Sequence, residues 1–164
     1  MGQYSIGQPV SRREDPRLLR GEGHFLQDTV LAGEAQAAIL RSPYAHASIG
    51  SIDRTEAESM QGVLAILIGA DYAADGLGSI PCDMSQSRRD GSPMYRPHRP
   101  AIAIDRAVHV GYPIAMVIAE TLDQAKDAAE RIEVAYEPLP VFTSTADALA
   151  DESPLVWEDC GSNE

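Results

Sequence analysis

With 164 residues, 44% of them hydrophobic, the chain is long enough for one domain with a buried core, which argues against disorder of the whole chain. It has no long apolar run and no basic start leading into an apolar stretch, so we expect no membrane span, no secretory signal and a cytoplasmic location. The net charge of −12 argues against nucleic acid as a partner, because neutralising phosphates requires a clustered positive surface.

The charge is unevenly distributed along the chain. Residues 1–110 hold 13 acids and 11 bases, whereas residues 111–164 hold 12 acids and 2 bases, which gives net charges of −2 and −10. Such an acidic half is most often a solvated face, and selection of a partner is the alternative. The two cysteines, Cys82 and Cys160, lack metal-ligand spacing, so we expect two free thiols.

Residues 1–22 are predicted to form an extended arm with one short helical turn. Pro16 fits the first turn of a helix with Asp15 before it as a cap, and Gly21 can end the turn. The arm is rich in both charges and poor in core-forming side chains, so we expect it to lie across another surface. Its candidate interface residues are Arg12, Arg13, Arg17 and Arg20.

Residues 23–150 are predicted to form the domain itself, beginning with strands at 35–40 and 47–52. The segment Arg41-Ser42-Pro43-Tyr44-Ala45-His46 joins them and combines a guanidinium, two hydroxyls and an imidazole beside a proline turn. One interpretation is a tight turn that ties the two strands together. The other is a docking corner, with candidate interface residues Arg41, Tyr44 and His46.

The middle of the chain is predicted to hold one helix, one strand and one long loop. Thr55–Glu58 fits a capping box before a short helix that stops near Gly62. Val63–Ile68 is an apolar run bounded by glycines, which predicts a central strand buried on both faces. Residues 76–100 are rich in chain breakers and predict a surface loop, which either faces water with its basic cluster or packs on a partner.

The last regular unit is predicted to be a strand at 114–119, a helix at 122–132 capped by Thr121, and a strand at 133–136. One helical face is apolar, formed by Leu122, Ala125, Ala129 and Ile132. Residues 46–68 follow the same plan of strand, capped helix and strand, which indicates two comparable units flanking one mixed sheet. If the strands of a unit are parallel, the connection must be a right-handed crossover.

Motifs for chemistry are missing from the sequence. The four histidines, His24, His46, His98 and His109, have no carboxylate or cysteine at ligand spacing, so hydrogen-bonding roles are favoured over metal binding. There is no phosphate-binding loop, no dinucleotide fingerprint and no nucleophile elbow. We therefore assign no catalytic, cofactor-binding or metal-binding residue.

Several motifs nevertheless point to one family, and together they span nearly the whole chain. They are Gly7–Phe25 (GQPVSRREDPRLLRGEGHF), Arg41–His46 (RSPYAH), Ile104–Arg106 (IDR), Val110–Ala115 (VGYPIA) and Val134–Pro140 (VAYEPLP). This combination resembles the start of molybdenum hydroxylase large subunits, the family of carbon monoxide dehydrogenase, xanthine dehydrogenase and aldehyde oxidase. In that family the molybdenum site lies beyond the matched segment, so no residue here takes over a catalytic role.

The resemblance implies an α+β fold, an α/β hammerhead with a mixed β-sheet, two main helices and an extended N-terminal arm, with residues 151–164 starting a linker toward molybdopterin-binding domains. It implies a structural and assembly segment, inactive alone, of an oxidoreductase that hydroxylates aldehydes or N-heterocycles or oxidises carbon monoxide. The full subunit would hold molybdopterin, for which the cytosine dinucleotide form is one option. Partner subunits or domains would hold [2Fe–2S] clusters and FAD.

The implied partners are the molybdopterin-binding domains, in the same subunit or an adjacent chain, and the iron–sulfur and flavin subunits. Two alternatives stay open. The chain is either a separately encoded interaction module of a split large subunit, or an inactive truncated product.

Overall fold

The computed structural model describes residues 11–84 and 86–163, so the start of the predicted arm lies outside the described residues. The described chain divides into two units, one ending at Glu34 and one beginning at Ala35. Among the described residues, no helix has the length and apolar character needed to cross a bilayer.

The first unit contains the predicted helical turn as α1 (Asp15–Leu19), followed by a 3-10 turn at Leu26–Asp28. Proline occupies the first turn of α1 as predicted, but the residue at the N-cap is Glu14 and its side chain makes no capping bond. Gly21, with a φ of 73°, ends the turn in a left-handed conformation that favours glycine.

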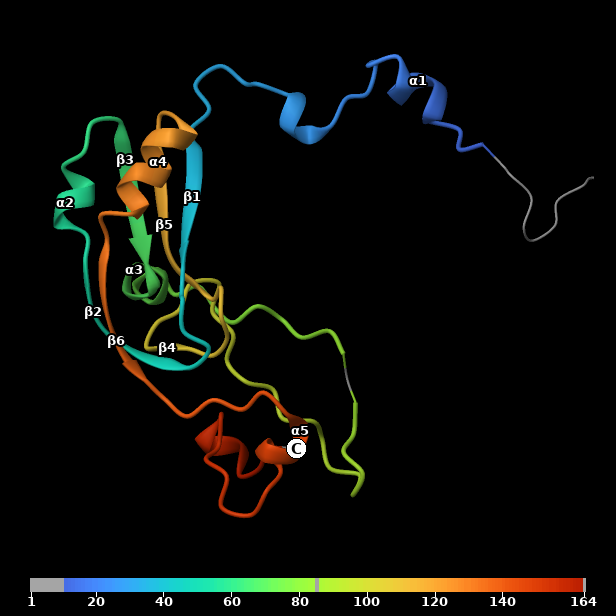
Figure 1. Cartoon of the computed structure of the whole chain (residues 1–164), viewed down its shortest axis with the longest axis vertical. Coiled ribbons are helices and arrows are strands. Elements are labelled where there is room, and N and C mark those ends of the chain that lie inside the picture. Colours follow the sequence, from blue (N-terminus) through green and yellow to red (C-terminus); the bar gives the residue numbers. More distant parts are fainter. Residues whose placement is uncertain (1–10, 85, 164) are drawn as a thin grey trace, which may run out of the picture. The chain divides into compact units, whose positions relative to one another are not determined.

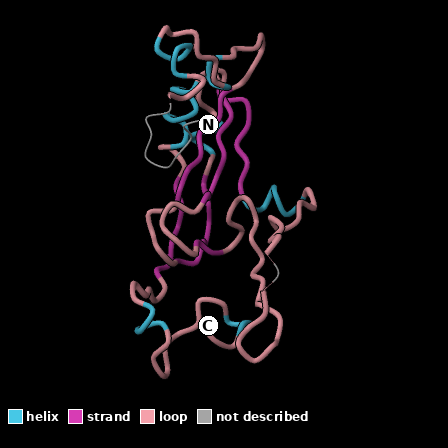
Figure 2. Tube along the Cα trace, turned by 90° about the vertical axis from the view of Figure 1, so that its right-hand side faces the viewer, coloured by secondary structure: helices cyan, strands magenta, loops and turns pink. Residues whose placement is uncertain are grey.

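The second unit is built from two three-stranded sheets (Figure 1). The strands are β1 (Gln36–Arg41), β2 (Ala47–Asp53), β3 (Val63–Ile68), β4 (Arg106–Ala107), β5 (Pro113–Ala119) and β6 (Glu133–Pro138). Sheet A has the order β1-β5-β3 and sheet B the order β4-β2-β6, and Figure 2 shows the strands running side by side. The fold is α+β, as predicted.

The pairing differs from the expected single mixed sheet, because every described strand pair is antiparallel. The reason is that each strand–helix–strand unit crosses between the sheets. The first unit runs from β2 in sheet B to β3 in sheet A, and the second runs from β5 in sheet A to β6 in sheet B. Neither unit joins two parallel neighbours, so no right-handed crossover is formed.

The helices of the second unit are short. They are α2 (Thr55–Glu58), α3 (Gly69–Ala74), α4 (Leu122–Ala129) and α5 (Thr145–Ala148), with a 3-10 turn at Glu158–Cys160. The sequence predicted α2 and α4 but neither α3 nor α5. Helix α3 has only six residues and begins with a glycine, so its sequence shows too little hydrophobic periodicity to predict a helix.

The larger core cluster lies between α4 and sheet A, and small side chains dominate it. The buried residues of this cluster are Ala57, Ile66, Ala115, Val117, Ala119, Ala125, Ala128, Ala129 and Ile132. Leu122, which the sequence placed on the same face, is 41% exposed because it stands in the first turn of α4, beyond the packed alanines. A second cluster is formed by Ile49, Ala103, Ala107, Tyr112 and Ile114.

Strand β3 is an edge strand, which corrects the prediction of a central strand buried on both faces. Ile66 is 5% exposed, but Leu64 and Leu67 are 58% and 38% exposed. The central position belongs to β5, which pairs with β1 on one side and β3 on the other. The apolar run therefore predicted that a strand forms here, but it did not predict the position of this strand in the sheet.

The two predicted helix caps have different outcomes. At α4, the Thr121 hydroxyl accepts from the Gln124 N–H at 3.3 Å and the Gln124 side chain accepts from the Thr121 N–H at 3.1 Å, which confirms the capping box. At α2 the prediction of a Thr55–Glu58 capping box is wrong, because no side chain caps this helix. Asp53 accepts from the Thr55 N–H at 2.9 Å, and this bond lowers the pKa of the Asp53 carboxyl.

The segment between α3 and β4 is irregular, as predicted, with one isolated bridge between Ser87 and Pro93 among its described residues. Its return to the sheet is fixed by a close approach at Gly69. A Cβ atom at this position would lie 2.0 Å from the carbonyl oxygen of Ala103. Glycine is therefore required where β3 meets α3.

Replacing Ile66 with Asp should destabilise the domain by about 3 kcal/mol or more, because a carboxylate would be buried against alanines without a partner. The same change at the exposed Leu64 should cost about 0.5 kcal/mol. Urea unfolding of the two variants measures the difference. Equal midpoints would show that Ile66 is not a core residue.

Thr121→Ala should cost about 1 kcal/mol, because it removes the hydroxyl that caps α4. Thr55→Ala is the matched control and should cost less, since no side chain caps α2 and the backbone N–H of Thr55 keeps its bond to Asp53. The hydroxyl contact with Asp53 that is lost joins two exposed residues. Thermal unfolding should separate the two variants. A larger loss for Thr55→Ala would contradict the assignment of the caps.

Candidate functional site

The four arginines of the arm lie in the first unit and are all exposed. Arg12 is 3.1 Å from Asp15, and Arg20 is 3.2 Å from Glu22, so two of the arginines form ion pairs within the arm. Exposed pairs of this kind contribute little to stability. Their role at an interface stays a prediction.

The second group of candidates forms the corner between β1 and β2. Ser42 is 2% exposed, and its N–H donates to the Tyr112 carbonyl at 2.9 Å. Its hydroxyl contacts both the N–H and the carbonyl of Tyr44 at 3.0 Å. Arg41 donates to the carbonyl of Gly111 at 2.9 Å. These bonds fasten the turn to the segment that leads into β5.

The ring of Tyr44 packs on Tyr136 of β6, with the ring centroids 5.0 Å apart. Burial raises the pKa of the Tyr136 hydroxyl. His46 is 8% exposed, and its Nδ1 lies 2.9 Å from the carbonyl of Pro140. Because a carbonyl only accepts, Nδ1 must carry a proton and act as the donor in this contact. Among the described residues, Nε2 of His46 is a buried nitrogen without a partner.

The corner thus holds Arg41, Tyr44 and His46 in one turn, where Arg41 and His46 each bind a backbone carbonyl of the domain. These contacts support the interpretation as a tight turn. Tyr44 remains 39% exposed, so its ring is accessible to a partner. Docking at this corner stays a prediction.

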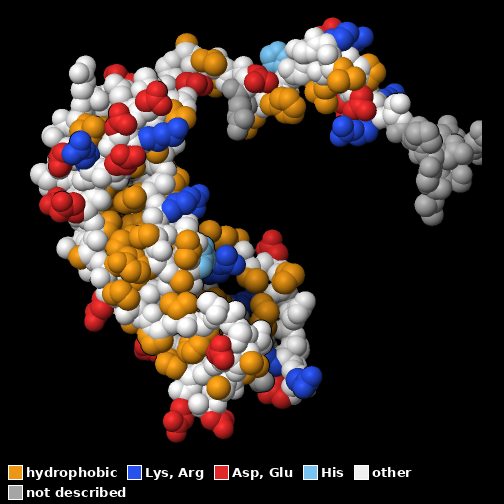
Figure 3. All heavy atoms as spheres, in the orientation of Figure 1, with side chains coloured by type: hydrophobic (Ala, Val, Ile, Leu, Met, Phe, Trp, Pro, Cys, Tyr) orange, Lys and Arg blue, Asp and Glu red, His pale blue; other side chains and the backbone are white. Residues whose placement is uncertain are grey.

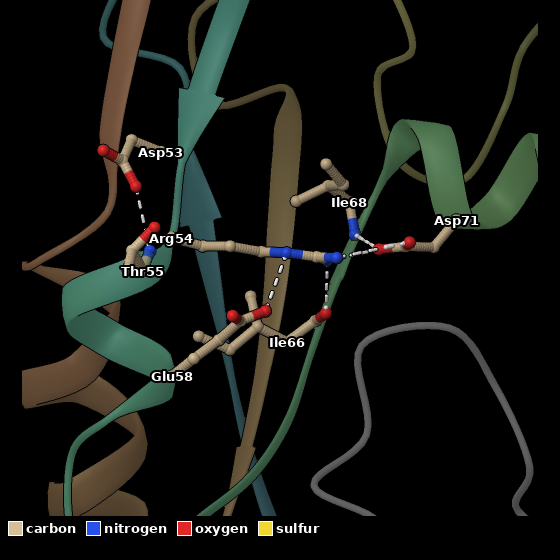
Figure 4. A network of polar contacts seen from close by, with 7 residues as sticks. All are labelled: Asp53, Arg54, Thr55, Glu58, Ile66, Ile68 and Asp71. Carbon is tan, nitrogen blue, oxygen red and sulfur yellow. Dashed lines mark hydrogen bonds and ion pairs between the residues drawn. The ribbon is translucent and has the colours of Figure 1, made fainter.

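Arg54, which the sequence did not single out, is the centre of a polar network (Figure 4). It pairs with Glu58 of α2 at 2.8 Å, donates to the carbonyl of Ile66 in β3 at 2.7 Å, and binds the carboxylate of Asp71 in α3. Asp71 also accepts from the N–H of Ile68 at 3.0 Å. One guanidinium therefore holds α2, β3 and α3 in place.

The Arg54 contacts lower the pKa of the Asp71 carboxyl, chiefly through the hydrogen bond from the guanidinium and then through the bond from the Ile68 N–H. The sequence carries a weak signal for this network. Arg54 follows β2 directly, and Asp71 lies three residues after β3, where a carboxylate can accept from the backbone at a helix start. Only the fold brings the two side chains together.

One hollow in the second unit has a volume of about 740 Å³, and we call it the C-terminal groove. Its inner wall includes Ala45, Val108 and Val110, close to β2 and β4. Its outer wall includes Val141, Phe142 and Trp157, from the segment that follows β6. This segment lies beyond the ends of the strands in Figures 1 and 2.

Polar contacts at the rim hold the outer wall of the groove. Tyr95 donates to Asp159 at 2.8 Å, and this bond raises the pKa of Tyr95 to about 12. Arg88 donates to the sulfur of Cys160 at 3.2 Å. Arg106 donates to the carbonyl of Val156 at 3.3 Å. The side chains of the two walls do not close the space between them.

The distribution of side chains gives no sign of a catalytic centre. Among the described residues, no group of three His, Cys, Asp or Glu side chains could hold a metal ion. On the face shown in Figure 3, charged side chains gather over α2 and α4, and apolar ones gather around α3. The described arrangement is that of a framework with surfaces for contact.

A protein family described as aldehyde oxidase and xanthine dehydrogenase, a/b hammerhead domain, matches residues 20–140. The gamma subunit of the 6-hydroxypseudooxynicotine dehydrogenase complex of Paenarthrobacter nicotinovorans is 38% identical over 93% of this chain and 19% of its own length. The carbon monoxide dehydrogenase large chain of Afipia carboxidovorans is 32% identical over 94% of this chain and 18% of its own length.

Solved structures of related enzymes also resemble this chain. Quinoline 2-oxidoreductase from Pseudomonas putida 86 superposes with a TM-score of 0.77 and 39% identity, over 93% of this chain and 19% of that one. A copper- and molybdenum-containing carbon monoxide dehydrogenase superposes with a TM-score of 0.73 and 32% identity. The chain therefore spans less than a fifth of the length of these relatives.

The Arg54 network should make stability depend on pH through Asp71. Because the folded pKa of Asp71 is lowered, its contribution is present above the unfolded value, about 3.9, and is lost as the pH falls through the folded pKa. Asp71→Asn should lower the urea midpoint at neutral pH, and the difference from the natural chain should vanish in acid.

Asp75→Asn, at the exposed C-terminal end of the same helix, is the control and should leave the midpoint nearly unchanged at both pH values. A difference between Asp71→Asn and the natural chain that persists at acid pH would mean that the charge of Asp71 is not what stabilises the network.

Proposed function

The chain belongs to the aldehyde oxidase and xanthine dehydrogenase family, and we propose that it serves as a structural and assembly segment of a molybdopterin-dependent oxidoreductase large subunit. The observation that carries this proposal is the match of the hammerhead domain to residues 20–140, combined with relatives about five times as long as the chain. In this role the segment provides a folded framework and contact surfaces, while the chemistry belongs to other parts of the enzyme.

The complete enzyme would hydroxylate an aldehyde or an N-heterocycle, or oxidise carbon monoxide. These reactions are in line with relatives that are named for quinoline and for carbon monoxide. Molybdopterin, in the cytosine dinucleotide form or another, would bind in the remainder of the large subunit, with [2Fe–2S] clusters and FAD in partner subunits or domains. The described residues offer no group of metal ligands, and the chemistry of the cofactor would be supplied where it binds in the remainder of the enzyme.

We further propose a cytoplasmic location and three contact regions on the chain. The arm at residues 1–22 would lie on another domain or subunit, the corner at Arg41, Tyr44 and His46 would dock nearby, and residues 151–164 would lead toward the molybdopterin-binding domains. The separation of the chain between Glu34 and Ala35 supports an arm that acts apart from the hammerhead proposed at residues 23–150, although it groups residues 23–34 with the arm. These domains could belong to the same chain or, in a split subunit, to an adjacent one.

The internal contacts explain how such a segment can act as a framework. Arg54 joins α2, β3 and α3, and the alanines of α4 pack directly on sheet A. Polar side chains at the turn between β1 and β2 are used to fix the backbone rather than being left free to react. A partner that binds this unit therefore meets a surface that is ordered in advance.

The proposal can be tested by supplying the chain in trans. It is co-expressed with the part of the Pseudomonas putida 86 quinoline 2-oxidoreductase chain that it does not match, together with the other subunits of that enzyme. We expect a complex that contains molybdenum and oxidises quinoline, with slower amide hydrogen exchange at residues 12–20 than in the chain alone.

The positive control supplies the enzyme's own matching segment in the same split form. Full molybdenum content and activity without any added segment would refute the assembly role. Stoichiometric molybdenum in the isolated chain would also contradict the proposal, because it would place the cofactor in this segment.

A further inference from the structure

The C-terminal groove has the dimensions of a small-molecule site. Its volume of about 740 Å³ lies within the range of about 300–1,000 Å³ that is typical of ligand pockets. The lining comes from the turn before β2, the loop before β4, the turn after β4 and the chain after β6. Segments that are far apart in the sequence therefore border one hollow that is large enough for a small organic molecule.

Aromatic side chains give the groove its apolar surface. Tyr95, Phe142 and Trp157 line it, and all three are only half-buried. Half-buried rings offer flat apolar surface on which another ring can pack, and aromatic pairs are favourable beyond the area that they bury. The walls of the groove therefore favour an occupant that is itself aromatic.

The side chains that can carry charge in the lining are basic. Arg88, His46 and His109 line the groove, and among the described residues no Asp or Glu does. Arg88 donates to the sulfur of Cys160 at 3.2 Å, and sulfur is a weak acceptor, so the guanidinium keeps donors for a stronger one. Asp90 lies near enough for the charge of Arg88 to help lower its pKa, but its carboxylate accepts from Ser92.

The acids of the neighbouring chain lie outside this lining. Glu158 and Asp159 line a second hollow, and both are already paired. Asp159 accepts from Tyr95 at 2.8 Å, and Glu158 lies 3.7 Å from the guanidinium of Arg106. Bases line the groove and acids line its neighbour, so the groove is the hollow that suits a negatively charged group.

His46 gives independent evidence for a polar occupant. It is 8% exposed and lines the groove, and its Nδ1 donates to the carbonyl of Pro140. Among the described residues its buried Nε2 has no hydrogen-bond partner, and a buried polar atom without a partner costs free energy. When protonated, Nε2 can donate to a carboxylate, so an occupant with this group would supply the partner that the chain does not.

We propose that the C-terminal groove binds a small aromatic carboxylate. The ring packs against Phe142 and Trp157, and the carboxylate lies within the basic lining, with Arg88 as its main donor. A planar guanidinium matches the two oxygens of a carboxylate, which is why arginine is common at such sites. This inference uses only residues of this chain and does not rest on the proposed function.

The single tryptophan of the chain allows a direct test, because Trp157 lines the groove and gives the only indole N–H signal in an NMR spectrum. The full chain is titrated with 2-naphthoate, and with 2-naphthamide as a neutral probe of nearly the same shape. We expect 2-naphthoate to shift the Trp157 signal until it saturates. The amide should bind roughly tenfold more weakly, because it cannot form charge-assisted hydrogen bonds with the basic lining.

Neighbouring arginines provide matched variants. Arg88→Gln should weaken the binding of 2-naphthoate about tenfold and leave the binding of 2-naphthamide nearly unchanged. Arg89→Gln removes the same charge at an exposed residue that does not line the groove, and it should change neither affinity. Cys160→Ala removes the present partner of Arg88, so it should leave the affinity for 2-naphthoate unchanged or raise it.

Several results would overturn the proposal. If 2-naphthamide binds as tightly as 2-naphthoate, or if the Trp157 signal does not saturate, the groove does not select a carboxylate. An equal loss of affinity in Arg88→Gln and Cys160→Ala would mean that the shape of the wall matters and the charge of Arg88 does not. Trp157 shifts that grow with the concentration of the chain without a probe would assign the groove to a second copy.

The same titration in the complex with the remainder of the quinoline 2-oxidoreductase chain gives a further check. Retained binding of 2-naphthoate supports a ligand site in the assembled protein. Loss of binding there would assign the groove to a protein contact and overturn the proposal. The titration of the chain alone does not depend on this complex, so failure of the complex to form counts against the proposed function only.

Discussion

The close approach of α4 to sheet A is the contact on which the domain depends. Alanine makes it possible, because Ala125, Ala128 and Ala129 meet Ala115 and Ala119 with little side-chain volume between helix and strand. Strand β5 lies beneath the helix and pairs with β1 and β3, so the same segment carries both the packing and the backbone pairing. Leu40, Ile52 and Val134 contact both core clusters and join sheet A to sheet B. A larger side chain at the alanine positions would separate these layers.

Local signals in the sequence predicted local structure well. The bounds of β3 agree with the apolar run Val63–Ile68, and Thr121 caps α4 through contacts that span only three residues. The place of β3 in the sheet could not be predicted in this way, because it depends on which strands pair with β5. At α2, Asp53 competes with Thr55 for the role of cap, and sequence spacing does not decide between them.

The candidate sites show the same limit. The corner at Arg41–His46 is continuous in sequence and was found, although its Arg41, Ser42 and His46 side chains bind backbone groups of the domain itself. The groove is lined by Val110 and Trp157, which come from segments with no shared periodicity. The sequence pattern therefore did not predict the groove. The family motifs predicted the family because they extend over much of the chain. Contacts between distant residues require the fold.

The Arg54 network also has a consequence for how this protein can associate. Strand β3 pairs with β5 on one side only, and the free side of an edge strand normally offers its N–H and C=O groups to a further strand. Here Arg54 takes the carbonyl of Ile66 and Asp71 takes the N–H of Ile68. These two side chains occupy two of the hydrogen-bonding positions that an added strand would use. A strand that pairs with β3 at Ile66 and Ile68 would therefore have to displace Arg54 and Asp71.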